Sequence, residues 1–174
     1  ALSYTPWLSE LFSNVYLVSL AGFYKIDNYQ VLSASFRRFS SDHIIFTNNF
    51  GTPQGIYVPG EFAVDAGYSR KLSEYFSGGI VLRFIHSDLT AGQVSGGGDS
   101  KAAMAVAGDL GFFYRKPVLR LDNINGKLGL GIQVSNVGNK VSYTADQEKS
   151  FLPINLRLGG AFTIIAGDHH SISL

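Results

Sequence analysis

Apolar and polar residues alternate along most of this chain. Between Phe62 and Ile164, even-numbered residues are aliphatic or aromatic over runs of about ten positions, while odd-numbered residues are polar, small or charged. A period of two places neighbouring side chains on opposite faces of a strand. The pattern therefore predicts β-strands that each have one apolar face and one polar face. In the stretch 61–70 the apolar positions are Phe62, Val64, Ala66 and Tyr68.

Seven strands and the start of an eighth are predicted from this alternation and from the turn residues between the runs. They cover about 15–25, 29–40, 61–71, 77–88, 101–115, 127–137 and 152–166, with the eighth beginning at His169. The connections at 27–28, 72–75 and 167–168 are short, whereas those at 41–60, 89–100 and 138–150 are long. The connection 116–126 lies on the short side yet has about eleven residues, so part of it is expected to extend the strands.

Long strands with short turns at one end and long loops at the other are typical of transmembrane β-barrels. Ten or more residues tilted near 45° cross the hydrocarbon layer of a bilayer, and soluble strands average about half that length. Tyrosines near the ends of the apolar faces fit an aromatic girdle at the water interface, although tyrosine also favours strands in general. They are Tyr16, Tyr24, Tyr68 and Tyr114. We therefore predict an all-β, antiparallel transmembrane β-barrel whose long loops face outward.

Composition excludes several other classes of protein. Charged residues make up 16% and aromatic residues 13% of the 174 positions, and the formal net charge is +1, with no basic stripe for nucleic acid. There is no cysteine, so disulfides and thiolate metal sites are excluded. No apolar run approaches the roughly 18–20 residues that a membrane-spanning helix needs.

The ends of the chain suggest a piece of a larger barrel. The N-terminus carries no basic, hydrophobic leader, so either a signal peptide has been removed or the chain is a piece of a longer one. The strand that begins at His169 stops after six residues with no partner to close against, which favours the second interpretation. We interpret 1–174 as a single outer-membrane barrel domain that is incomplete at both ends, with about seven or eight strands present.

The odd-numbered face carries charges of both signs. Three are cationic and three anionic, and buried charges need partners, so we expect them to pair across a lumen. These six residues are Arg37, Glu61, Asp65, Arg83, Asp109 and Arg157. The rest of this face is largely glycine, alanine and serine, which leaves room for either a plug or a channel, and the sequence does not decide between them.

Catalytic and metal-binding arrangements are not predicted. His86, Ser87 and Asp88 are the residue types of a catalytic triad, but consecutive strand residues point to opposite faces. His169 and His170 are also consecutive, so their side chains would point to opposite faces and would not form a metal site together. The glycine-rich segment 96–99 is not followed by a helix whose N-terminus would hold phosphate. We therefore expect no enzyme activity, no metal and no cofactor.

Several segments are similar to a known family of outer-membrane proteins. The chain resembles the PorV family, the outer-membrane barrels of the bacterial type IX secretion system, which belong to a wider group similar to long-chain fatty-acid transporters. The resemblance covers most of the chain and is most specific between Glu61 and Thr90. The segments are SYTPWL (3–8), LAGFYKID (20–27), QVLSASFRRFS (30–40), PGEFAVDAGYSRKLSEYFSGGIVLRFIHSDLTAGQ (59–93) and FLPINLRLGGAF (151–162).

The resemblance implies a fourteen-stranded barrel, of which this chain would be about half, and a role without catalysis. Members of the family receive the C-terminal signal domain of secreted cargo from the translocon and deliver it to a cell-surface attachment complex with a sortase-like protease. The outer loops are the candidates for gripping cargo. Their aromatic residues Phe50, Tyr57 and Tyr143 are the type that anchors interfaces, but they could equally pack the loops against one another.

Two other functions fit the same pattern. A transporter of hydrophobic small molecules would use the glycine- and alanine-lined face. A soluble barrel would bind a ligand inside, but its even face would then expose a very large apolar belt to water.

Overall fold

The protein is all-β in the part of the chain that the computed structural model describes, which is 1–7, 14–48, 50–89, 101–121, 124–143, 149–166 and 170–174. Nine strands form one antiparallel sheet in the order β1-β2-β3-β6-β7-β8-β9-β10-β11, and β4 and β5 form a separate two-stranded sheet. The strands are β1 (Leu2–Pro6), β2 (Tyr16–Lys25), β3 (Gln30–Ser40), β4 (Ile44–Thr47), β5 (Pro53–Tyr57), β6 (Gly60–Lys71), β7 (Phe76–Asp88), β8 (Ala103–Leu121), β9 (Ile124–Gly138), β10 (Asn155–Ala166) and β11 (His170–Ser173).

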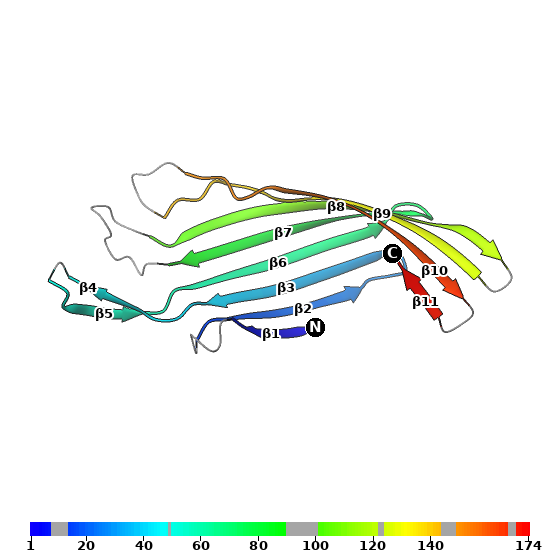
Figure 1. Cartoon of the computed structure of the whole chain (residues 1–174). Helices are drawn as coiled ribbons and strands as arrows, with labels where there is room; N and C mark the ends of the chain where they lie inside the picture. Colours follow the sequence, from blue (N-terminus) through cyan, green and yellow to red (C-terminus); the bar gives the residue numbers. More distant parts are fainter. Residues whose placement is uncertain (8–13, 49, 90–100, 122–123, 144–148, 167–169) are drawn as a thin grey trace.

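Successive strands lie side by side in the main sheet, and the β4–β5 hairpin is inserted between β3 and β6. Figure 1 shows a long curved wall with this hairpin projecting from one end. We call that end, where β3, β7 and β9 finish, the loop end. The opposite turn end holds the short connections 26–29 and 72–75. Among the described residues, long connections at one end and short turns at the other therefore agree with the sequence prediction.

The register keeps the apolar positions on one face across strand boundaries. Phe36 pairs with Val64, Val64 with Phe84, and Phe84 with Val106, so even-numbered residues meet even-numbered residues. The large apolar side chains on this even face are exposed; Leu82 and Leu158, for example, are 64% and 73% accessible. The wall therefore presents a continuous apolar surface that nothing in the described chain covers.

Most buried residues are small or polar and lie at odd-numbered positions. Among the described residues, the only buried hydrophobic side chains are Ala103, Ala105 and Ala107, which alternate along β8. The buried polar residues include Ser87 and Asp109, which have the same parity. A soluble sheet of this size would bury its large apolar side chains, so the arrangement is inverted relative to a soluble protein. None of the described residues forms a helix long and apolar enough to cross a membrane.

The predicted strands are present, with some differences at their limits. Strands β8 and β9 extend to Leu121 and from Ile124, so much of the connection 116–126 belongs to strands, as expected. The predicted count of seven or eight strands was too low, because β1 was missed and the expected loop 41–60 contains β4 and β5. Strand β11 is described from His170; His169, the turn 167–168 and the glycine-rich 96–99 lie outside the described residues. In this part of the chain β1 and β11 are the free edges of the sheet, and closure into a barrel stays a prediction.

A β-bulge interrupts the alternation near the end of β9. The register between β8 and β9 shifts between Gly108 and Leu110, and Asn136 has a φ of 62°. Asparagine tolerates this left-handed conformation better than most residues. Val137 consequently pairs with Gly108, so the rule that odd positions face the polar side ends at this bulge.

Candidate functional site

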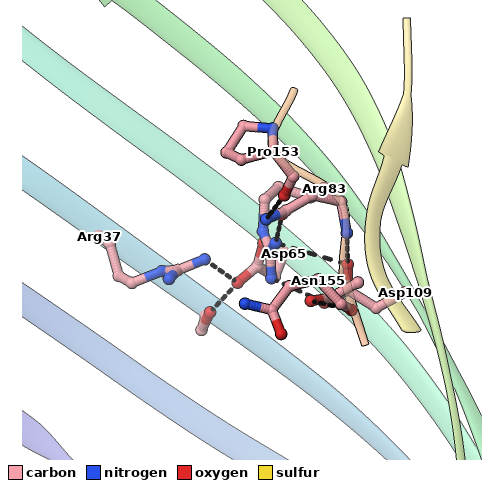
Figure 2. A network of polar contacts seen from close by, with 9 residues as sticks. Arg37, Asp65, Arg83, Asp109, Pro153 and Asn155 are labelled. Carbon is pink, nitrogen blue, oxygen red and sulfur yellow. Dashed lines mark hydrogen bonds and ion pairs between the residues drawn. The ribbon is translucent and has the colours of Figure 1, made fainter. Parts of the chain in front are cut away.

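Four of the six predicted charged residues form one cluster on the odd face, near the loop end. Ser35, Asp65 and Arg83 are neighbours in register on β3, β6 and β7, which explains why their side chains meet. Asp65 Oδ2 accepts hydrogen bonds from Ser35 Oγ at 2.7 Å and Arg37 Nη2 at 2.9 Å. Asp65 Oδ1 accepts a bond from Arg83 Nε at 2.7 Å. Figure 2 shows Asp65 between the two arginines.

Arg83 extends the cluster to the next two strands. Its Nη2 donates to Asp109 Oδ2 at 3.0 Å, and its Nη1 donates to Asn136 Oδ1 at 2.5 Å. Arg83 is 14% exposed and Asp109 is 7% exposed, so these charges are largely withdrawn from water. Two aspartates and two arginines balance in charge, and breaking such a pair would leave an uncompensated buried charge.

The bulge residue Asn136 closes the cluster. Its main-chain N–H donates to Asp109 Oδ1 at 2.9 Å, and its Nδ2 donates to the carbonyl oxygen of Pro153 at 3.1 Å. At this left-handed position, the main-chain N–H and the side-chain Oδ1 of Asn136 both meet charged side chains, those of Asp109 and Arg83. Sequence analysis missed this residue, although an Asn followed two residues later by Gly138, inside an otherwise alternating strand, is a recognisable bulge signal.

Glu61 and Arg157 are not part of this cluster. Glu61 accepts a hydrogen bond from Ser87 Oγ, and the Tyr143 hydroxyl donates to Ser87 Oγ at 3.0 Å. Arg157 makes no ion pair with the described residues. The expected set of three cations and three anions is therefore divided into a four-residue cluster, a Glu61–Ser87–Tyr143 chain and a separate arginine.

Two adjoining cavities lie along the odd face. One of about 460 Å³ is lined by charged residues that include Arg37, Glu61, Asp109 and Arg157. The other, of about 430 Å³, is lined largely by glycines and phenylalanines, and Arg157 also lines it. The odd face is thus polar toward the loop end and apolar toward the turn end. The residues that line this second cavity include Gly78, Gly79, Gly111, Gly131, Gly159 and Phe113.

The β4–β5 hairpin continues the β3–β6 pair beyond the wall, and residues 44–60 contain no charged side chain. Phe50 is 93% exposed at its tip, where Asn48 Oδ1 accepts hydrogen bonds from the main-chain N–H groups of Phe50 and Thr52. Tyr57 instead points back to the wall and donates to the carbonyl oxygen of Asp88 at 3.3 Å. Burial, together with Asp88, raises the pKa of the Tyr57 phenol.

The three predicted cargo-binding aromatics therefore have different surroundings. Phe50 is free at the tip of the hairpin, whereas Tyr57 and Tyr143 both bond to the end of β7, at Asp88 and Ser87. Tyr57 and Tyr143 thus bond to consecutive residues of β7. The structure does not join them to Phe50 in one cluster.

Two residues of the rejected catalytic triad, His86 and Ser87, lie on opposite faces of β7. His86 stacks on Phe62 with ring centroids 5.1 Å apart on the even face, while Ser87 bonds to Glu61 on the odd face. In the described part of the chain, no group of three histidine, aspartate or glutamate side chains is arranged to hold a metal ion.

Comparison with known proteins gives one family. A family model described as "Type IX secretion system protein PorV" matches residues 1–174, the full length of the sequence. No curated protein matches the chain.

Proposed function

Because the chain belongs to the PorV family of the type IX secretion system, we propose that its sheet is part of a transmembrane β-barrel in the bacterial outer membrane that receives secreted cargo at its loop end. Family membership gives the protein a role in this secretion system, and the family is not a known enzyme family. The membrane location and the handling of cargo are the parts that we propose.

The exposed even face is the observation that carries the membrane assignment. Its apolar side chains extend from Leu20 on β2 to Ile172 on β11, and Arg38 and His86 lie among them near the loop end. Soluble monomers rarely expose a continuous apolar surface of more than a few hundred Å², whereas the outer wall of a membrane barrel consists of one.

Aromatic pairs near both ends of this face support the same assignment. Tyr4 and Tyr16 lie with ring centroids 5.6 Å apart at the loop end, and Phe76 stacks on Phe112 at 5.5 Å at the turn end. Aromatic rings are enriched where a membrane protein meets the water interface.

The β4–β5 hairpin is the element that we assign to cargo. It extends beyond the wall at the loop end, has no charge, and presents Phe50 at its tip. Exposed aromatic anchors of this kind supply much of the affinity at protein interfaces. We propose that the bound group is the C-terminal signal domain of a secreted protein, and that Tyr57 and Tyr143 hold the loops in position. Translocon and attachment-complex subunits would then be the other partners.

Capture of a purified cargo signal domain by the whole protein in detergent tests this assignment. Phe50→Ala should weaken capture by about tenfold or more, as expected for an interface anchor. Leu72→Ala is the matched control, because Leu72 is an exposed apolar residue in a turn-end connection. Unchanged capture by Phe50→Ala would overturn the assignment of the hairpin.

A second candidate function has one observation in its favour. The apolar cavity of about 430 Å³ on the odd face would accept part of an acyl chain, as in a transporter of hydrophobic small molecules. Mass spectrometry of the protein purified in detergent would show a lipid retained in a fixed ratio if this is correct, and no retained lipid if it is not.

A further inference from the structure

The two edges of the β4–β5 hairpin differ in how they could meet another strand. Strand β4 pairs with β5 alone, and neither strand joins the main sheet, so each has one free edge. A free edge exposes main-chain N–H and C=O groups that can pair with another chain, and proteins usually protect such edges with charges, prolines or bulges.

Strand β5 carries these protective features. It begins at Pro53, contains Gly55, and the register shifts where Thr47 faces Pro53. Proline removes an N–H donor and a bulge bends the strand, so both features oppose the addition of a further strand.

Strand β4 has none of them. Its sequence is Ile-Ile-Phe-Thr, without proline, glycine or charge, and all four residues are of types that favour strands. Ile44 and Ile45 are exposed, and they lie at the loop end outside the wall, so their exposure is not explained by contact with lipid. A short, uncharged strand of high β-propensity with an open edge is the kind of element that pairs with another strand.

We propose that the free edge of β4 binds the cargo signal domain by strand addition, in which an extended and uncharged segment of the cargo pairs antiparallel or parallel with Ile44–Thr47. This inference rests on the proposed function and gives the mode of binding at the same hairpin. Main-chain hydrogen bonds supply affinity in this mode, while alternate side chains supply specificity. An uncharged strand suits an apolar segment because no charge has to be desolvated.

The register shows which main-chain groups remain free. Asn48 N–H donates to the carbonyl oxygen of Thr52, and Thr47 lies opposite a proline that has no N–H. Because donors alternate in direction along a strand, Ile45 and Thr47 direct their N–H groups toward the free edge of β4. Ile56, which faces Ile45 directly, directs its N–H toward the free edge of β5.

This alternation supplies a matched pair of substitutions. Ile45→Pro removes one donor from the free edge of β4, and Ile56→Pro removes one from the free edge of β5. Both leave the hydrogen bonds between β4 and β5 in place. The two isoleucines are 51% and 71% exposed.

The experiment measures the dissociation constant for a purified cargo signal domain with the whole protein in detergent. Ile45→Pro should weaken binding by about tenfold or more, because it removes a hydrogen bond and obstructs the incoming strand. Ile56→Pro and the conservative Ile45→Val should bind within about threefold of the wild type. Equal binding by both proline variants, or equal loss in both, would overturn the assignment to β4. Failure of the wild type to bind cargo would instead refute the proposed function.

A second measurement distinguishes cargo from another copy of the chain as the occupant. The sequence has no cysteine, so Thr47→Cys introduces one reactive thiol at the free edge. A cross-link from this thiol to the signal domain supports the proposal. A disulfide between two copies of the protein in the presence of cargo would contradict it.

Discussion

The sharpest prediction concerns Leu82, in the middle of β7 on the even face. Leu82 is 64% exposed, and its neighbours in register are Ala66 and Gly108. In water, exchanging such an exposed residue for arginine would change stability by no more than about 0.5 kcal/mol. Near the midplane of a bilayer, the same exchange costs about 2–4 kcal/mol. We expect the larger cost for Leu82→Arg, because the even face is proposed to contact lipid.

The control is Leu72→Arg, since Leu72 is 56% exposed but lies in the turn-end connection 72–75. Its cost should stay near 0.5 kcal/mol or below. The assay is urea unfolding of the protein refolded in phospholipid vesicles, followed by the fluorescence of its single tryptophan and by gel mobility with and without heating. If Leu82→Arg and Leu72→Arg lose stability equally, the even face does not lie in lipid.

Three further predictions follow from the odd face and the hairpin. Arg83→Gln should destabilise the fold by about 3–5 kcal/mol, because two largely buried aspartates lose their partner, whereas Arg157→Gln should cost about 0.5 kcal/mol or less; equal unfolding midpoints in urea would refute the cluster. Gly138→Ala should cost about 1–3 kcal/mol, since its methyl group would meet the main chain of β8; Gly159→Ala, which has nothing within 4 Å of the new methyl, should unfold like the wild type. Burial raises the pKa of Tyr57, so the stability that its neutral phenol contributes is present below about pH 10 and is lost as the pH rises through the raised pKa. The absorbance titration of the wild type minus Tyr57→Phe should therefore have a midpoint above 10, and a midpoint at 10 would contradict this environment.

Alternation was sufficient to predict most of the wall. Predicted strands such as 29–40 and 61–71 agree with β3 and β6 to within one residue at each end. Residues 61–69 alternate with a strict period of two, whereas 29–40 alternates clearly only around Leu32–Phe36 and has Arg38 at an apolar position. Strand β1, at Leu2–Pro6, was missed because five residues are too few for the pattern to stand out.

The hairpin could not be predicted in the same way. β4 is apolar at Ile44, Ile45 and Phe46 without alternation, because neither of its faces packs on the wall. Periodicity reports a difference in environment between two faces, and a hairpin that projects from the protein has no such difference.

The charged cluster was predictable only in part. Parity placed Arg37, Asp65, Arg83 and Asp109 on one face, and the structure joins them. Parity could not show that Glu61 bonds to a hydroxyl instead of an arginine, because that depends on how the loop-end residues meet across strands. The role of Asn136 depends on a bulge, which reverses the parity on which the prediction relied.

The central claim is that the even face contacts lipid and the odd face does not. Single cysteines along β7, which the cysteine-free sequence permits, would carry spin labels at even positions 80, 82 and 84 and at odd positions 79, 81 and 85. In the whole protein in vesicles, the even positions should be accessible to oxygen, which concentrates in lipid, and the odd positions should not. Absence of a two-residue period, or the opposite phase, would contradict the claim.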